Sequence, residues 1–143
     1  YGHLTNKDYY QCIEDRCHCV KTLIEKVHFN ESKPENMNVY ISSMKDKYIM
    51  VYKNNKWTIQ NRKETIDDIY DRNEYELSNW YDKFHEKYPK LIKSFELYLE
   101  NKENNDVVDR IKELILLEFY NNRNVVKNTT MYKNSIIEYN NDL

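Results

Sequence analysis

Glycine and proline are scarce in this chain, which has one glycine and two prolines in 143 residues. Tight turns and flexible linkers usually depend on these two residue types, so their scarcity favours helices joined by polar loops. Asparagine can replace glycine in turns because it tolerates a left-handed backbone, and the pair Asn54-Asn55 is placed for this role. We therefore expect a mainly helical chain with asparagine-containing turns.

Long apolar runs are missing as well. No stretch approaches the roughly 18 apolar residues of a membrane span, and no signal peptide is recognisable. The three cysteines lie close together, and their odd number argues against a disulfide scaffold and for a reducing compartment. We expect an intracellular domain without membrane contact. Since the sequence begins at Tyr1, we also expect it to begin inside a longer protein or after processing.

The net charge of −2 lacks the basic excess that is typical of nucleic-acid-binding domains. The charge is nevertheless unevenly distributed. Residues 39–63 carry six cations and one acid, a net charge of +5, whereas residues 64–86 carry eight acids and two cations, a net charge of −6. The basic end of such a dipole could meet phosphate. The alternative is a solvated surface on which the charges happen to segregate.

Apolar spacing predicts a single α+β domain over residues 1–126. Thr5 and Asp8 are spaced as a helix start, a break is expected near residues 17–19, and a second short helix is expected over residues 20–26. Strand patterns follow at residues 39–41, 48–52 and 57–59, with a hairpin turn between the last two. A sheet this small needs helices on one face.

From about residue 63 the pattern is helical. We expect a break at residues 71–74, a restart after Pro89, and a last helix over residues 106–121. Because that last helix is apolar on more than one side, we expect it to be the central core helix or a dimer contact. Residues 127–143 are polar and are expected to form a flexible tail.

Two groups of residues could carry chemistry. The first group is Cys12, Cys17, His18 and Cys19. Zinc sites usually combine two well-separated ligand pairs, and here no second pair follows, so we expect free thiols and no metal or cofactor.

The second group lies in the polar loop before the strands and includes His28, Asn30, Glu35 and Asn36. Such residues could form a metal-dependent nuclease site, in which histidine activates water and asparagine orients a ligand. The helix after the hairpin has no histidine before His85, and its carboxylates Glu64, Asp67 and Asp68 could substitute as metal ligands only loosely. The alternative is that the polar side chains bond the backbone of their own loop and fix its shape.

The central stretch resembles a known domain. The resemblance rests on His28-Phe29-Asn30, on residues 34–42, on residues 47–52 with Lys56-Trp57, and on the later Tyr120-Asn121-Asn122-Arg123. These residues are similar to a C-terminal domain of proteins from large nucleocytoplasmic DNA viruses, notably the mimivirus group. The similarity covers residues 5–126. The family often has histidine where Lys33 and Met37 stand here.

The resemblance implies an accessory role, because the viral domain is found beside zinc-finger, KilA-N-like and GIY-YIG nuclease modules and brings no activity of its own. We therefore expect a non-catalytic module of a DNA-associated viral protein, located in the host cytoplasm, a viral factory or the virion. Its expected partners are DNA, another protein or a second copy of itself; a nuclease and a purely structural oligomerisation domain are the alternatives. The residues expected to make contacts are His28, Asn30, Glu35, Asn36, Asn38, Lys45, Lys47, Lys53, Lys56 and Arg62.

Overall fold

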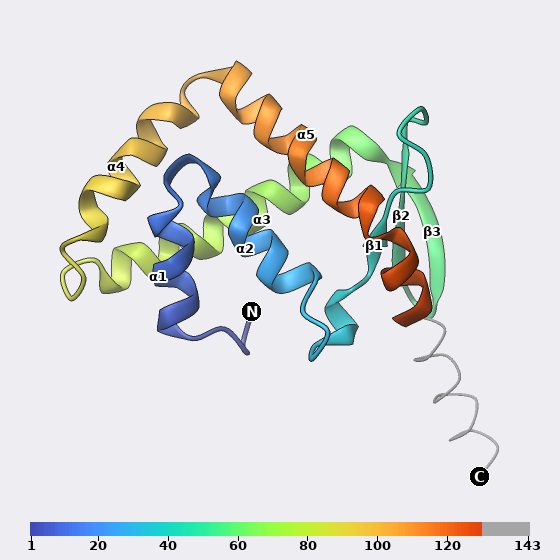
Figure 1. Cartoon of the computed structure of the whole chain (residues 1–143), viewed down its shortest axis with the longest axis horizontal. Helices are drawn as coiled ribbons and strands as arrows, with labels where there is room; N and C mark the ends of the chain where they lie inside the picture. The colour runs from blue at the N-terminus through green and yellow to red at the C-terminus, as the bar shows by residue number, and fades with distance from the viewer. Residues whose placement is uncertain (130–143) are drawn as a thin grey trace, which may run out of the picture.

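A small antiparallel sheet stands at one end of a group of helices in the computed structural model, which describes residues 1–129 (Figure 1). The fold is α+β, as the sequence predicts. The predicted flexible tail lies outside the described residues from residue 130 onward. The elements are α1 (Asn6–Glu14), the 3₁₀ helix η1 (Arg16–His18), α2 (Cys19–His28), the 3₁₀ helix η2 (Pro34–Asn36), β1 (Val39–Tyr40), β2 (Tyr48–Lys53), β3 (Lys56–Asn61), α3 (Arg62–Phe84), α4 (Leu91–Lys102) and α5 (Asn105–Asn121).

The first two helices begin as the sequence predicts. Thr5 and Asp8 form a reciprocal capping box at the start of α1, which satisfies backbone N–H groups that have no partner within the helix. The expected break is η1, where Arg16 adopts a left-handed backbone with φ of 56°. Helix α2 contacts α1, α3 and α5, and most of its residues are buried. It is therefore the central helix of the core.

The sheet has the order β1-β2-β3 and is antiparallel throughout. Lys53 pairs with Lys56 across the predicted hairpin turn, in which Asn54 and Asn55 both have positive φ. The Ile49 side of the sheet faces the hydrophobic core and is covered by helices. On the other side, Tyr40 and Trp57 pack in a T-shaped contact beside the buried Val126.

Helix α3 corrects one expectation. The break predicted at residues 71–74 is absent, because α3 runs continuously for 23 residues from Arg62 to Phe84. Its buried stripe continues through this segment: Asn73 occupies the buried position between Ile69 and Leu77, one turn from each. The polar residue Asn73 on the core side of the helix interrupts the apolar pattern without interrupting the helix.

Helix α5 corrects a second expectation. Only Ile111, Ile115 and Phe119 are buried, so α5 covers the core along one stripe and is not its central helix. Figure 1 shows α4 and α5 leading from the far end of α3 back to β1. Among residues 1–129, no helix combines the length and apolar character needed to cross a membrane.

Candidate functional site

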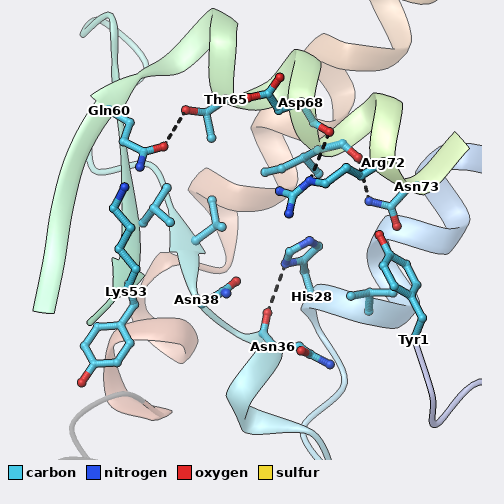
Figure 2. A pocket seen from close by; sticks show the side chains of 15 residues that line it. Tyr1, His28, Asn36, Asn38, Lys53, Gln60, Thr65, Asp68, Arg72 and Asn73 are labelled. Carbon is cyan, nitrogen blue, oxygen red and sulfur yellow. Dashed lines mark hydrogen bonds between the residues drawn. The ribbon is translucent and has the colours of Figure 1, made fainter. Parts of the chain in front are cut away.

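A polar cavity of about 370 Å³ lies where the end of α2, the sheet and the middle of α3 meet (Figure 2). Its walls come from segments far apart in the sequence. The end of α2 contributes His28, the segment before β1 contributes Asn38, and the end of β2 contributes Lys53. Helix α3 contributes Asp68, Arg72 and Asn73, which follow one another along a single face. Only the tertiary structure brings these side chains together.

His28 lies in the inner wall and is held as a neutral imidazole. Its side chain is 9% exposed and contacts Phe119 edge to face. The Nδ1 atom lies 3.1 Å from the backbone oxygen of Asn36, and because a carbonyl only accepts, Nδ1 must carry the proton. Burial lowers the pKa of His28 to about 4, against the opposing effect of the Asn36 hydrogen bond. At neutral pH its Nε2 atom is therefore a hydrogen-bond acceptor.

Asn73 supplies a second acceptor whose orientation is fixed. Its Nδ2 group donates to the Ile69 carbonyl at 2.7 Å, so the amide cannot flip without setting two oxygens against each other. The side chain is 1% exposed, and its Oδ1 atom has no hydrogen-bond partner. A buried acceptor without a partner costs free energy, so the Oδ1 atom of Asn73 is a candidate for a bond to a ligand or a water. The Oδ1 atom of Asn38 is also buried, and the Asn38 side chain lies beside His28, where its hydrogen bonding opposes the lowering of the pKa of that ring.

The mouth of the cavity carries charge. Figure 2 shows the Arg72 side chain reaching over His28, while Lys53 extends along the opposite wall toward Gln60. Arg72 donates through Nε to the Asp68 carbonyl at 3.4 Å, and neither Arg72 nor Lys53 forms an ion pair among residues 1–129. The Asp68 carboxylate is exposed at the same mouth. Two cations and one acid leave this opening with a net positive charge.

The residues predicted for the polar loop divide between the cavity and the loop itself. His28, Asn36 and Asn38 line the cavity, whereas Asn30 and Glu35 do not. Asn30 Oδ1 accepts from both the backbone N–H and the hydroxyl of Ser32, so it holds its own loop. Glu35 is exposed. The four residues of the nuclease alternative therefore do not meet in one cavity, and residues 1–129 contain no cluster of three potential His, Cys, Asp or Glu ligands for a metal.

The predicted basic residues lie at both ends of the hairpin. Lys53 and Lys56 flank its turn, whereas Lys47 directly precedes β2, and its carbonyl accepts from the backbone N–H of Arg62 at the other end of the sheet. Six strand residues separate the ends by about 20 Å. Lys45, Lys47, Lys53 and Lys56 are exposed, and none of them forms an ion pair in the described part of the chain.

Arg62 differs from these lysines. Its side chain is only partly exposed, and one guanidinium nitrogen donates to the Met44 carbonyl at 3.1 Å. This bond fixes the loop between β1 and β2 onto the start of α3. Arg62 therefore has a structural role in addition to the contact role predicted for it.

The cysteines are free thiols, as the sequence predicts. Cys12 and Cys19 are buried in the core, and Cys17 is half-buried. Burial raises the pKa of Cys12 to about 12 and raises that of Cys19 as well. Metals and electrophiles react with thiolates, so these two side chains act as small hydrophobic residues.

Sequence reasoning missed Arg72 and Asn73 as site residues and considered Asp68 only as a loose substitute for a metal ligand. Arg72 had no distinguishing neighbours in the sequence. Asn73 did carry a signal, since it is a lone polar residue on the apolar stripe formed by Ile69 and Leu77. A buried polar residue usually has a hydrogen-bond partner, and Asn73 lies in the lining of the cavity, where a ligand could supply one.

Comparison with known proteins adds no relative: no family model, no curated protein and no solved structure matches this chain. The resemblance to the viral domain therefore stays a prediction.

Proposed function

We propose that this chain is a non-catalytic module of a DNA-associated protein and that the lysines of its hairpin contact the nucleic-acid backbone. The observation that carries the proposal is the set of four exposed lysines, Lys45, Lys47, Lys53 and Lys56, which have no acidic partner among residues 1–129. A lysine that is not neutralised by a neighbouring acid can release counterions from a phosphate backbone. The resemblance to viral proteins would place such a module in a viral factory or a virion.

The arrangement of the lysines suits an extended polyanion. The two ends of the hairpin are about 20 Å apart, a distance that covers about six phosphates along one strand of a duplex. The acidic helix α3 begins directly after β3, so a duplex bound along the hairpin would be kept away from the helical side by charge repulsion.

The test is a titration of a fluorescently labelled DNA duplex at low and moderate salt. We expect affinity to fall with salt and to fall further in Lys45→Gln/Lys47→Gln and in Lys53→Gln/Lys56→Gln. If each pair contacts phosphates, each double variant reduces the slope of log affinity against log salt by about 2. Comparing the two pairs shows whether DNA spans the hairpin or touches one end.

A matched control comes from the corner between α3 and α4. Lys87 and Lys90 are also exposed and have no ion pair in the described residues. Lys87→Gln/Lys90→Gln makes the same change in net charge and should leave the salt slope unchanged. An equal effect of the control, or no binding of wild type at low salt, contradicts the proposal.

Self-association is a second candidate, because α5 leaves two leucines in solvent. Leu114 is 37% exposed and Leu117 is 38% exposed, and they lie one turn apart. Sedimentation equilibrium tests this candidate. A dimer that Leu114→Glu/Leu117→Glu converts to monomer supports it, and a wild-type monomer at high concentration excludes it.

A further inference from the structure

We propose that the cavity between α2, the sheet and α3 binds a nucleotide, with the base against the inner wall and the phosphate at the mouth. The proposal goes beyond the contact of the hairpin with nucleic acid and does not depend on it. Only Lys53 belongs to both surfaces, and the other residues that carry the argument, His28, Arg72 and Asn73, are separate from the four lysines.

The inner wall selects the neutral part of the ligand. Asn73 Oδ1 is buried, lacks a partner and cannot be exchanged for the amide nitrogen, which is held by Ile69. His28 has its Nδ1 proton on the Asn36 carbonyl, so Nε2 can only accept. Asn73 Oδ1 therefore requires a hydrogen-bond donor on the ligand, and His28 Nε2 can accept from a second donor.

Those donors must be uncharged. Asn73 and His28 are neutral, and the acid that lines the cavity, Asp68, is exposed at its mouth. A buried ammonium group would have no compensating charge there and would face the Arg72 guanidinium, which disfavours amino acids and amines. Amino and ring N–H groups of a nucleobase provide uncharged donors on a flat surface.

The mouth selects the charged part of the ligand. The guanidinium of Arg72 and the ammonium of Lys53 have no ion pair among residues 1–129, and they approach the opening from opposite walls (Figure 2). Phosphate accepts several charge-assisted hydrogen bonds and is a good match for an arginine combined with a lysine. The cavity volume of about 370 Å³ lies within the range of small-ligand sites.

The experiment is isothermal titration calorimetry of the chain with AMP, GMP, CMP and UMP, with inorganic phosphate and the matching nucleosides as separate probes. We expect one-to-one binding of at least one nucleotide and weaker binding of both of its parts. Arg72→Gln should weaken binding by about tenfold or more, since it removes a charge-assisted hydrogen bond. Asp68→Asn should strengthen it, since it removes a negative charge beside the phosphate.

The variant Asn73→Leu tests nucleotide binding without an expected loss of stability. Leucine continues the stripe of Ile69 and Leu77 and removes the unpartnered oxygen, so we expect the thermal midpoint to be unchanged or higher and nucleotide binding to weaken by about tenfold. Arg110→Gln, at an exposed position on α5 outside the cavity lining, is the matched control for Arg72→Gln and should bind like wild type.

Three results would overturn the proposal. The first is no saturable binding of any of the four nucleotides, which would mean that the cavity holds water. The second is inorganic phosphate binding as tightly as the nucleotides, which would make this a simple anion site. The third is unchanged nucleotide affinity in both Arg72→Gln and Asn73→Leu. None of these results bears on duplex binding, which is measured with the lysine variants.

Discussion

The helices and the sheet of this protein differ in how their aromatic residues and lysines are packed and paired. In the helices, Trp80 is 7% exposed and stacks between Tyr9 and Tyr88, and Lys112 donates to Asp67 at 2.9 Å. In the sheet region, Tyr48 is 58% exposed, and the four lysines have no ion pair among the described residues. Trp80 and Lys112 thus stabilise the helices, whereas Tyr48 and the four lysines of the sheet region are presented to solvent. Within the sheet, the aromatic residues Tyr40 and Trp57 do pack together.

The cavity lies at the boundary between these regions. His28 and Asn73 come from core positions of helices, but each keeps a polar atom directed away from the apolar packing. The Oδ1 atom of Asn73, which is buried and has no hydrogen-bond partner among residues 1–129, belongs to the lining of this cavity. Buried polar atoms are usually bonded, so this atom is a candidate for a bond to a ligand.

The largest expected effect is on the free energy of unfolding, and it differs between the two tryptophans. Trp80→Ala should lower the free energy of unfolding by about 3–5 kcal/mol, because it removes a buried ring and leaves a cavity. It also removes the indole N–H bond to Asn6 at 3.0 Å. Trp57 is half-buried, so Trp57→Ala should cost about half as much. Urea unfolding measures both, and equal losses would show that the sheet is as much a part of the core as the helices.

The pH dependence of His28 is the next effect in size. Its pKa in the folded chain is about 4, below the value of about 6.5 of an unfolded histidine, so the unfolded state binds more protons between these values. Stability contributed by the neutral ring is complete above about pH 6.5 and is lost as the pH falls toward 4. We expect this loss to be about 3 kcal/mol.

The control for this prediction is His28→Gln, which can still donate to the Asn36 carbonyl but does not titrate. The free energy of unfolding of each protein is measured with urea at about pH 7 and about pH 4.5. Carboxylates titrate in both proteins, so their contribution is removed when the two changes in free energy are subtracted. Wild type should lose more stability than the variant over this interval. Parallel losses would mean that His28 takes up its proton over the same pH range in the folded and unfolded chains.

A smaller effect is expected when a helical ion pair is broken. Lys112 pairs with Asp67 and lies over the Tyr70 ring, 5.1 Å from its centroid. Lys112→Gln should lower the free energy of unfolding by about 1 kcal/mol, and added salt should narrow the difference. The hydrogen bond from Lys112 holds the pKa of Asp67 below its usual value, so the same variant should raise that pKa in an NMR titration.

The smallest effect is expected at the hairpin. Lys47 is exposed and unpaired within residues 1–129, so Lys47→Gln should change the free energy of unfolding by less than about 0.5 kcal/mol. Chemical denaturation beside Lys112→Gln provides the measurement. A loss as large as that of Lys112→Gln would show that the hairpin lysines stabilise the fold, and the contrast between the two regions would not hold.

Local chemistry made much of the fold predictable. The capping box at Thr5, the hairpin at Asn54-Asn55, the alternation along the strands and the last helix follow from interactions between residues a few positions apart. The two corrections share a cause. On α3 a polar residue stands on the buried stripe, and on α5 extra leucines stand outside it. Apolar periodicity is misleading in both cases, because burial depends on what packs against a helix.

The site was only partly predictable for the same reason. His28 and Asn38 stood out within a polar loop, and the lysines stood out by charge. Arg72 did not stand out, and Asn73 was marked only by its place on the apolar stripe of α3. Both lie more than thirty residues beyond Asn38 in the sequence.

By itself, the sequence determined the helices, the hairpin, the free cysteines and the basic segment, because each depends on propensity or composition over a short stretch. The tertiary structure alone decided that α2 is central, that α3 is unbroken and that a polar cavity forms between α2, β2 and α3. The physical reason is that burial and hydrogen-bond satisfaction are properties of packed surfaces. Whether Asn73 finds a partner depends on residues from other segments, and no local pattern encodes that.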